Sequence, residues 1–180
     1  MTRYQLINRL DLKLLKEAKL NSWAKLIVLH RWVKFDCNYH EAFGKHIDVT
    51  RAYPMIQNLR KAGLVLGPTG RILQLGYDVA KHLDDIGFDM TAENIYIFPG
   101  RQVMPVSELR IISTIIVNGP VTRNDLLSHV DMGGECYAKE VFSRMLYRQG
   151  ILDNISTKRS GVYTLSEKAS DLIETLCEPA

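Results

Sequence analysis

The chain has 180 residues, of which 46% are hydrophobic and 24% charged, and its 23 Lys and Arg residues against 20 Asp and Glu residues give a formal net charge of +3. These are globular values, and the length suits one ordinary domain or two small ones. No run approaches the ~20 apolar residues of a membrane span, so the sequence predicts no membrane partner. No apolar run follows the basic residues of the N terminus, so we expect no signal peptide. Three widely spaced cysteines predict reduced thiols in a cytoplasmic protein.

The positive charge is concentrated at the N terminus. Residues 1–21 carry five Lys or Arg and two Asp or Glu, which gives +3, and residues 22–180 therefore carry 18 of each sign. The same segment predicts one helix, Thr2–Lys19, with Leu6, Ile7, Leu10 and Leu14 on one face. Two interpretations of that face stay open: pairing with its twin in a homodimer, or packing on the core of the first domain.

The next residues predict a helical unit that ends in a hairpin. Pro54 falls within one helical pattern, so we expect that helix to start near Tyr53, with the proline in its first turn. Gly63 ends the helix, and two apolar strands flank a turn at 67–70. The expected helices of this half are 23–35, 39–47, 50–62 and 77–86.

A segment of 88–104 then predicts a linker, too apolar for a flexible tether, in which Ile95–Phe98 forms a short strand or packs between the halves. The second half repeats the order, with Gly150 ending a helix before a second hairpin that returns through Val162–Leu165. Its expected helices are 108–117 (capped by Ser107), 123–129, 136–149 and 167–177 (capped by Ser166).

The repeat is visible as fixed offsets between the halves. Leu59 matches Leu146 and Gly63 matches Gly150, both 87 residues apart, while Leu75 matches Leu165 at 90. The last offset predicts that the second hairpin is three residues longer than the first.

A basic-faced helix that runs directly into a basic-tipped hairpin resembles the recognition helix and wing of winged-helix domains such as the MarR and PadR regulators. The resemblance covers residues 22–87 and 105–177 and concerns the fold, not a chemistry. It implies a mainly α protein with small β wings: an N-terminal helix (1–21), winged-helix domain 1 (22–87), a linker (88–104) and winged-helix domain 2 (105–180).

The resemblance further implies sequence-specific binding of double-stranded DNA, with transcriptional regulation as its use. Arg51, Gln57, Asn58 and Arg144 are the expected base readers, because Arg pairs with guanine and Gln or Asn with adenine, and Lys158 and Arg159 are expected at phosphates. The full set of candidate DNA-binding residues is Thr50, Arg51, Tyr53, Gln57, Asn58, Arg60, Lys61, Arg71, Tyr137, Lys139, Ser143, Arg144, Tyr147, Arg148, Lys158 and Arg159.

Two other functions remain open. Origin recognition by a plasmid or phage initiator would use the same DNA contacts, and a protein-binding adaptor would present the same faces to another protein. Glu140 on the second helix and the neutral body of the chain favour the adaptor. A continuous basic stripe over both helices and wings would favour DNA.

The sequence predicts no enzyme and no cofactor. Cys37, His40 and His46 lack the fourth ligand of a zinc site, so no metal is expected. The turn at 67–70 is not followed by the Gly-Lys-Ser/Thr of a phosphate-binding loop. His30, on an apolar helix face, is expected to be a core residue with one hydrogen bond.

Overall fold

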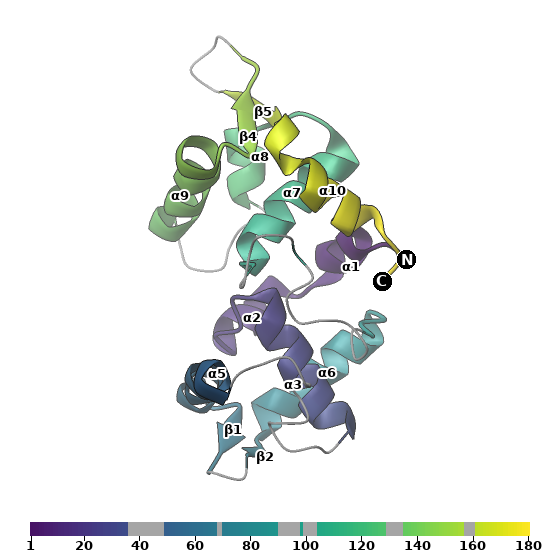
Figure 1. Ribbon diagram of the computed structural model, residues 1–180, viewed down its shortest axis with the longest axis vertical. Helices are drawn as coiled ribbons and strands as arrows, with labels where there is room; N and C mark the ends of the chain where they lie inside the picture. The colour runs from purple at the N-terminus through teal and green to yellow at the C-terminus, as the bar shows by residue number, and fades with distance from the viewer. Residues whose placement is uncertain (36–48, 68–69, 90–97, 99–103, 129–134, 157–160) are drawn as a thin grey trace.

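The structure is a computed structural model of the chain (Figure 1). It describes residues 1–35, 49–67, 70–89, 98, 104–128, 135–156 and 161–180, but not the side chains of 49–52 and 135–138. The expected helix 39–47 and the expected strand over Ile95–Ile97 lie outside the described residues.

The fold is mainly helical, with a few short antiparallel strands, which confirms the predicted fold class at that level. The helices are α1 (Arg3–Arg9), α2 (Leu12–Glu17), α3 (Trp23–Phe35), α5 (Val49–Lys61), α6 (Gln74–Asp85), α7 (Val106–Asn118), α8 (Arg123–Ser128), α9 (Glu135–Ser143), the π-helical segment η1 (Arg144–Gln149), the 3-10 turn η2 (Glu167–Ala169) and α10 (Ser170–Cys177). The strands are β1 (Val65–Leu66), β2 (Arg71–Ile72), β3 (Val121–Thr122), β4 (Leu152–Asn154) and β5 (Val162–Leu165). No described helix has the length and apolarity that a membrane crossing requires.

The lower half in Figure 1 is built on α3, which packs against α6. Helix α3 has the bounds predicted from the sequence, and nine of its thirteen residues are buried. The β1–β2 hairpin closes against its end, where a Cβ atom on Gly70 would lie only 1.9 Å from Cζ2 of Trp32. Only glycine therefore fits at this point of the turn.

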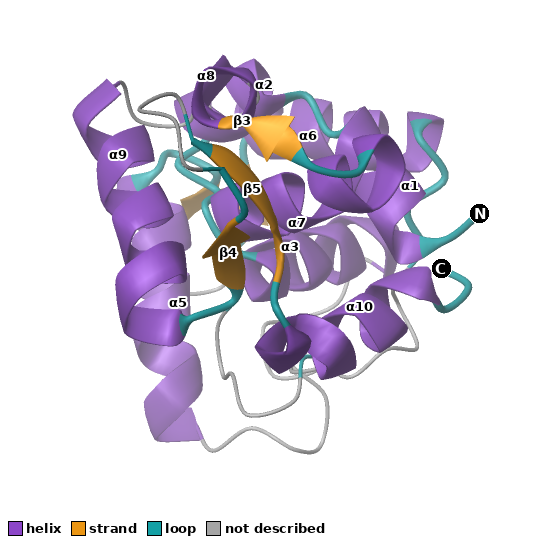
Figure 2. Ribbon diagram, turned by 90° about the horizontal axis from the view of Figure 1, so that it is seen from above, coloured by secondary structure: helices purple, strands orange, loops and turns teal. Residues whose placement is uncertain are grey.

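The upper half is built on α7, which contacts α1, α9, α10 and β5. Its sheet has three strands in the order β3-β5-β4, all antiparallel (Figure 2). The sequence predicted the hairpin β4–β5 but not the pairing of Val121–Thr122 with β5. Phe142 of α9 joins helix and sheet, because its ring stands edge-on to Tyr163 of β5 with 4.6 Å between centroids.

The pairing registers correct the predicted offset after the hairpins. Val65 pairs with Ile72, and Leu152 pairs with Leu165. Val65 and Leu152 are 87 apart, whereas Ile72 and Leu165 are 93 apart, so the second hairpin is longer by six residues (93 − 87) and not by three. The earlier match of Leu75 with Leu165 used spacing alone and is wrong.

The N-terminal segment is two helices and not the single predicted one. Helix α1 ends at Arg9, and Asp11 starts α2 by accepting hydrogen bonds from the backbone N–H groups of Lys13 and Leu14 at 2.9 and 3.1 Å. At the break, the buried Arg110 of α7 donates to the carbonyl oxygens of Asn8 at 2.8 Å and Leu10 at 2.6 Å. Apolar spacing could not reveal this break, because a capping aspartate and a distant arginine cause it.

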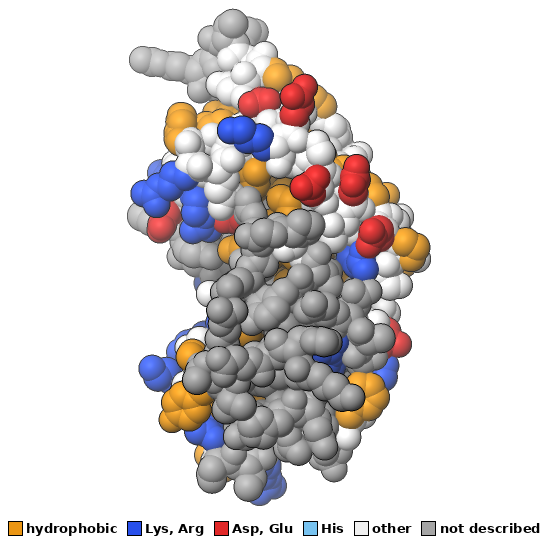
Figure 3. Space-filling model, viewed as in Figure 1, with side chains coloured by type: hydrophobic (Ala, Val, Ile, Leu, Met, Phe, Trp, Pro, Cys, Tyr) orange, Lys and Arg blue, Asp and Glu red, His pale blue; other side chains and the backbone are white. Residues whose placement is uncertain are grey.

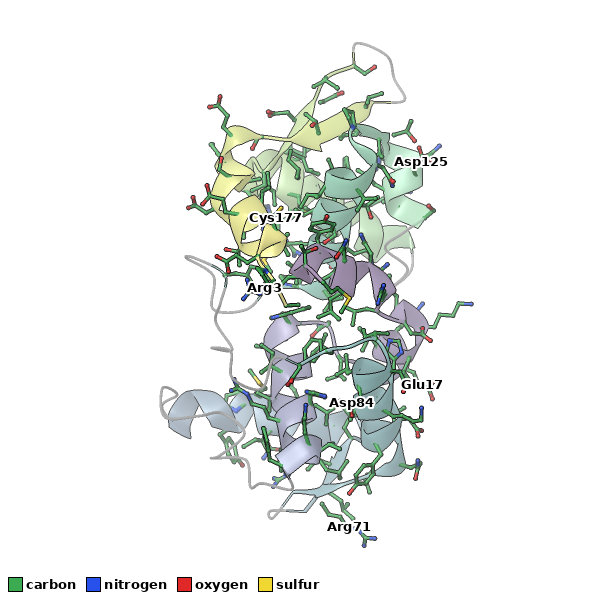
Figure 4. The ribbon with its side chains drawn as sticks, turned by 90° about the vertical axis from the view of Figure 1, so that its right-hand side faces the viewer. Arg3, Glu17, Arg71, Asp84, Asp125 and Cys177 are labelled. Carbon is green, nitrogen blue, oxygen red and sulfur yellow. The ribbon has the colours of Figure 1, made fainter. Side chains whose placement is uncertain are left out.

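Helix α1 packs on α7 and α10 of the second half, an arrangement that neither interpretation of the apolar face predicted. Leu6 and Ile7 are fully buried there, which leaves them no surface for a twin helix. Arg3 adds an ion pair with Glu178 and a 2.9 Å hydrogen bond to the carbonyl oxygen of Thr175, beside the C-terminal helix in Figure 4.

Several predicted helix ends need correction. Pro54 is the sixth residue of α5, which therefore lacks one internal hydrogen bond; the ring lies on the exposed side of the helix. Helix α6 begins at Gln74, three residues early, and α7 begins at Val106 after Pro105, which leaves Ser107 buried inside the helix. Ser166 precedes a 3-10 turn, and its hydroxyl donates to the carbonyl oxygen of Gly150 at 2.5 Å.

Gly63 and Gly150 end their helices with φ of +72° and +66°, as predicted. The last helical turn before each glycine differs between the two halves. The N–H of Leu64 donates to the carbonyl oxygen of Leu59, whereas the N–H of Ile151 donates to that of Met145. The structural match of Leu59 is therefore Met145, at an offset of 86, and η1 accommodates one extra residue as a π-helical turn.

We predict that replacing Arg110 destabilises the whole chain. In Arg110→Met the carbonyls of Asn8 and Leu10 lose their donors, and each unsatisfied buried acceptor costs about 1–3 kcal/mol. Urea unfolding followed by circular dichroism measures the loss. The control Arg148→Met, at an exposed site, should stay within about 0.5 kcal/mol of the unchanged protein. Equal stability of the two variants would show that the guanidinium does not hold the α1–α2 break.

Candidate nucleic-acid interface

Helix α5 presents an exposed polar face because its apolar residues recur at helical spacing. Met55, Ile56 and Leu59 are buried against the core. The candidate residues on the other face are exposed (Tyr53, Asn58, Lys61) or half-buried (Gln57, Arg60). Thr50 and Arg51 belong to α5, but their side chains lie outside the described residues.

The segment α9–η1 is the corresponding element of the second half. Val141, Phe142 and Met145 are buried, which fixes the side that faces the core. The guanidinium of Arg123 in α8 lies over the ring of Phe142, 5.5 Å from its centroid. Four candidate residues are exposed: Lys139, Ser143, Tyr147 and Arg148.

The wings are described in part. Arg71, on β2, is exposed at the hairpin end in Figure 4 and forms no ion pair with any carboxylate that the structure describes. The side chain of Tyr137, and both Lys158 and Arg159, lie outside the described residues, so the proposed phosphate contacts of the second wing stay predictions.

Arg144 has a different environment from the one predicted. Its Nε and Nη2 atoms lie 2.8 and 2.7 Å from Oε1 of Glu108, a residue of α7 that is 1% exposed. The Nε–Nη2 edge of the guanidinium is therefore occupied by a buried carboxylate, although 29% of the side chain stays exposed. Arg144 holds η1 on α7, and its expected base contact stays a prediction.

Glu108 and Gln149 complete this cluster, and sequence analysis missed both. The amide of Gln149 donates to Oε1 of Glu108 at 3.3 Å, so the carboxylate holds the first and last residues of η1. The available signal was an acidic residue in a helix in which seven of the thirteen residues are apolar and only Arg110 is also charged. A buried carboxylate needs such partners, because its desolvation is not compensated otherwise.

Two views place the candidate helices on one side of the molecule. Helices α5 and α9 both lie on the left in Figure 1 and again in Figure 2, where the molecule is seen from above. In Figure 3, Lys and Arg side chains gather along that left edge at the heights of the two helices. Asp and Glu gather on the upper right, over the region of α10, where Glu167, Asp171, Glu174 and Glu178 are exposed. A nucleic acid at the basic edge would lie away from the acids of α10, but it would also meet Glu140, which is exposed on α9.

His30 meets its prediction. It is 1% exposed, its Nε2 atom lies 2.7 Å from Oδ1 of Asp84, and its ring stands edge-on to Phe88. Within the described part of the chain, no three His, Cys, Asp or Glu residues form a group that could hold a metal ion. Cys37, His40 and His46 lie outside that part.

No protein-family model, characterised protein or solved structure matches this chain significantly. What the chain does must therefore be argued from its own residues.

We predict that Arg144→Met destabilises the fold, because it leaves the buried carboxylate of Glu108 without its ionic partner. Breaking a buried pair costs about 3–5 kcal/mol, and the partial exposure of Arg144 places the expected loss at about 2–3 kcal/mol. Denaturant unfolding measures it. Adding Glu108→Gln removes the buried charge, so the double variant should be more stable than Arg144→Met alone. Losses that simply add would mean that the two side chains are not coupled.

Proposed function

We propose that the chain is a tandem winged-helix protein that binds double-stranded DNA in a sequence-specific way and acts in the cytoplasm as a transcriptional regulator. The single observation that carries the proposal is that α5 and α9–η1, the two helices that run directly into hairpins, lie on the same side of the molecule (Figure 1), and each carries exposed cations.

The local backbone supports a winged-helix assignment for both halves. In each half the helix ends at a left-handed glycine, a two-stranded antiparallel hairpin follows, and a backbone bond closes the hairpin at its base. That closing bond runs from Leu73 N–H to the Leu64 carbonyl at 2.9 Å in the first half, and from Ser166 N–H to the Ile151 carbonyl at 3.0 Å in the second. In the second half, β3 adds the third strand on which a wing is normally built.

The exposed side chains suit a duplex. Asn58 and Gln57 can pair with adenine edges in a major groove, while Lys61, Arg71 and Arg148 supply cations for phosphates. None of these three cations is paired with a carboxylate that the structure describes, so their charge is available to a polyanion.

A protein-binding adaptor is the second candidate, because the same surfaces also expose large apolar groups. Tyr147 is 80% exposed, Tyr53 61%, Leu66 58% and Ile155 57%. Such groups anchor protein interfaces, although aromatic side chains also pack against sugars and bases. The steep salt dependence of a polyanion complex separates the two candidates.

The deciding experiment is selection of binding sites from random duplex DNA, followed by titration of the enriched duplex against salt. The proposal expects one enriched motif and binding that weakens steeply as salt rises. Failure to enrich any motif, with only weak salt-sensitive association, would reject sequence-specific recognition and favour the adaptor.

We predict that the double variant Arg71→Ala with Arg148→Ala binds the enriched duplex more weakly. It should lower the slope of log K against log salt by about two, since each phosphate contact contributes about 0.9. The matched control is Lys81→Ala, an exposed cation of α6, which is on the opposite side from α5 in Figure 1. The control should leave the slope unchanged. Because it removes one charge and the double variant removes two, a control effect half as large as that of the double variant would mean that the charges act only through net charge.

A further inference from the structure

The two halves of the chain meet in a short antiparallel pairing. The N–H of Trp23 donates to the carbonyl oxygen of Met104 at 2.9 Å, and the N–H of Val106 donates to that of Asn21 at 3.0 Å, on either side of the bridge between Ser22 and Pro105.

The two hydrogen bonds are equivalent, because they join corresponding residues of the two halves in opposite directions. Trp23 is the first residue of α3 and Val106 is the first residue of α7, at an offset of 83, and each helix has 13 residues. The same offset relates Asn21 to Met104. An antiparallel pair has a local two-fold axis, so here the axis relates one half of the chain to the other.

The wider arrangement follows that axis. In Figure 1 the β1–β2 hairpin is at the bottom of the long axis and the β4–β5 hairpin at the top, so the wings lie at opposite ends. Helices α5 and α9 nevertheless share one side, and α6 and α10 lie on the other side in both Figure 1 and Figure 2. A two-fold axis perpendicular to the long axis has this result: it exchanges the ends and keeps the same side facing outward.

Equivalent cations flank the axis. Lys61 and Arg148 are both exposed and both stand two residues before the glycine that ends their helix, 87 residues apart. The neighbouring position differs, with a half-buried Arg60 in one half and the exposed Tyr147 in the other. The halves therefore place similar charges symmetrically and different reading groups beside them.

We propose that one chain binds DNA as a built-in dimer: its halves read two unlike half-sites in inverted orientation on one face of the duplex, with the two wings on the outer flanks. This inference rests on the proposed function. Dimeric helix-turn-helix proteins place half-site centres about 10 bp apart, one helical turn, and the same spacing is expected here. The segment that could have paired two chains, α1, is already packed within this one.

The test locates each wing on the DNA. Single cysteines replace the exposed Leu66 on β1 or Ile155 beside β4, in a background where Cys37, Cys136 and Cys177 are serine and binding of the enriched duplex is retained. An iron chelate attached to the cysteine cleaves the nearest sugars. Tyr77→Cys on α6, on the opposite side, is the control and should give no cleavage.

The proposal expects the two wing probes to cut at opposite outer ends of the site, and native mass spectrometry to find one chain per duplex. One wing cutting between the half-sites would mean a head-to-tail arrangement and would overturn the inference while leaving DNA binding intact. Two chains per duplex would do the same. Absence of any enriched duplex would overturn the proposed function and this inference together.

Discussion

The arrangement of the whole molecule depends on the backbone pairing of residues 21–23 with residues 104–106. Both principal helices, α3 and α7, start at this pairing, so it sets the direction in which each half extends. The ring of Trp23 anchors it, with centroids 5.3 Å from Phe88, the first residue of the connecting segment, and 6.2 Å from Phe98 within that segment. Because the bonds lie beside buried aromatic rings, water competes poorly for them, and the junction is firm.

The N-terminal segment ties the halves together a second time. Helix α1 packs on the second half. The N–H of Asp11, just after α1, donates to Nε2 of His82 in the first half at 2.9 Å. Arg110 lies at the α1–α2 break, and burial lowers the pKa of its guanidinium. The group remains charged at neutral pH, because an arginine starts from so high a value. Of the five cations in residues 1–21, only Arg3 is buried by this packing, and the other four are exposed.

Sequence analysis succeeded where one local pattern determines the structure. The bounds of α3, the glycines that end two helices and the return strand Val162–Leu165 all follow from short-range periodicity and backbone preference. It failed where a distant residue decides. The break after Arg9 involves Arg110, which is 100 residues from Leu10 in the sequence, in addition to the local cap Asp11. The environment of Arg144 depends on Glu108, which is 36 residues away. The sequence does not show whether a charged side chain on a predicted helix face pairs with a buried group from a distant segment.

The π-helical turn has a consequence for the relation between the halves. The offset between matching positions is 83 at the first helices, 86 at Leu59 and Met145, 87 at the glycines and 93 after the hairpins. An alignment of the chain with itself must therefore open gaps of three, one and six residues within about fifty positions. Two halves of similar shape can in this way share almost no recognisable sequence. The single-residue gap corresponds to the π-helical turn η1. This wider turn accommodates the extra residue without changing the buried face before it or the hairpin after it.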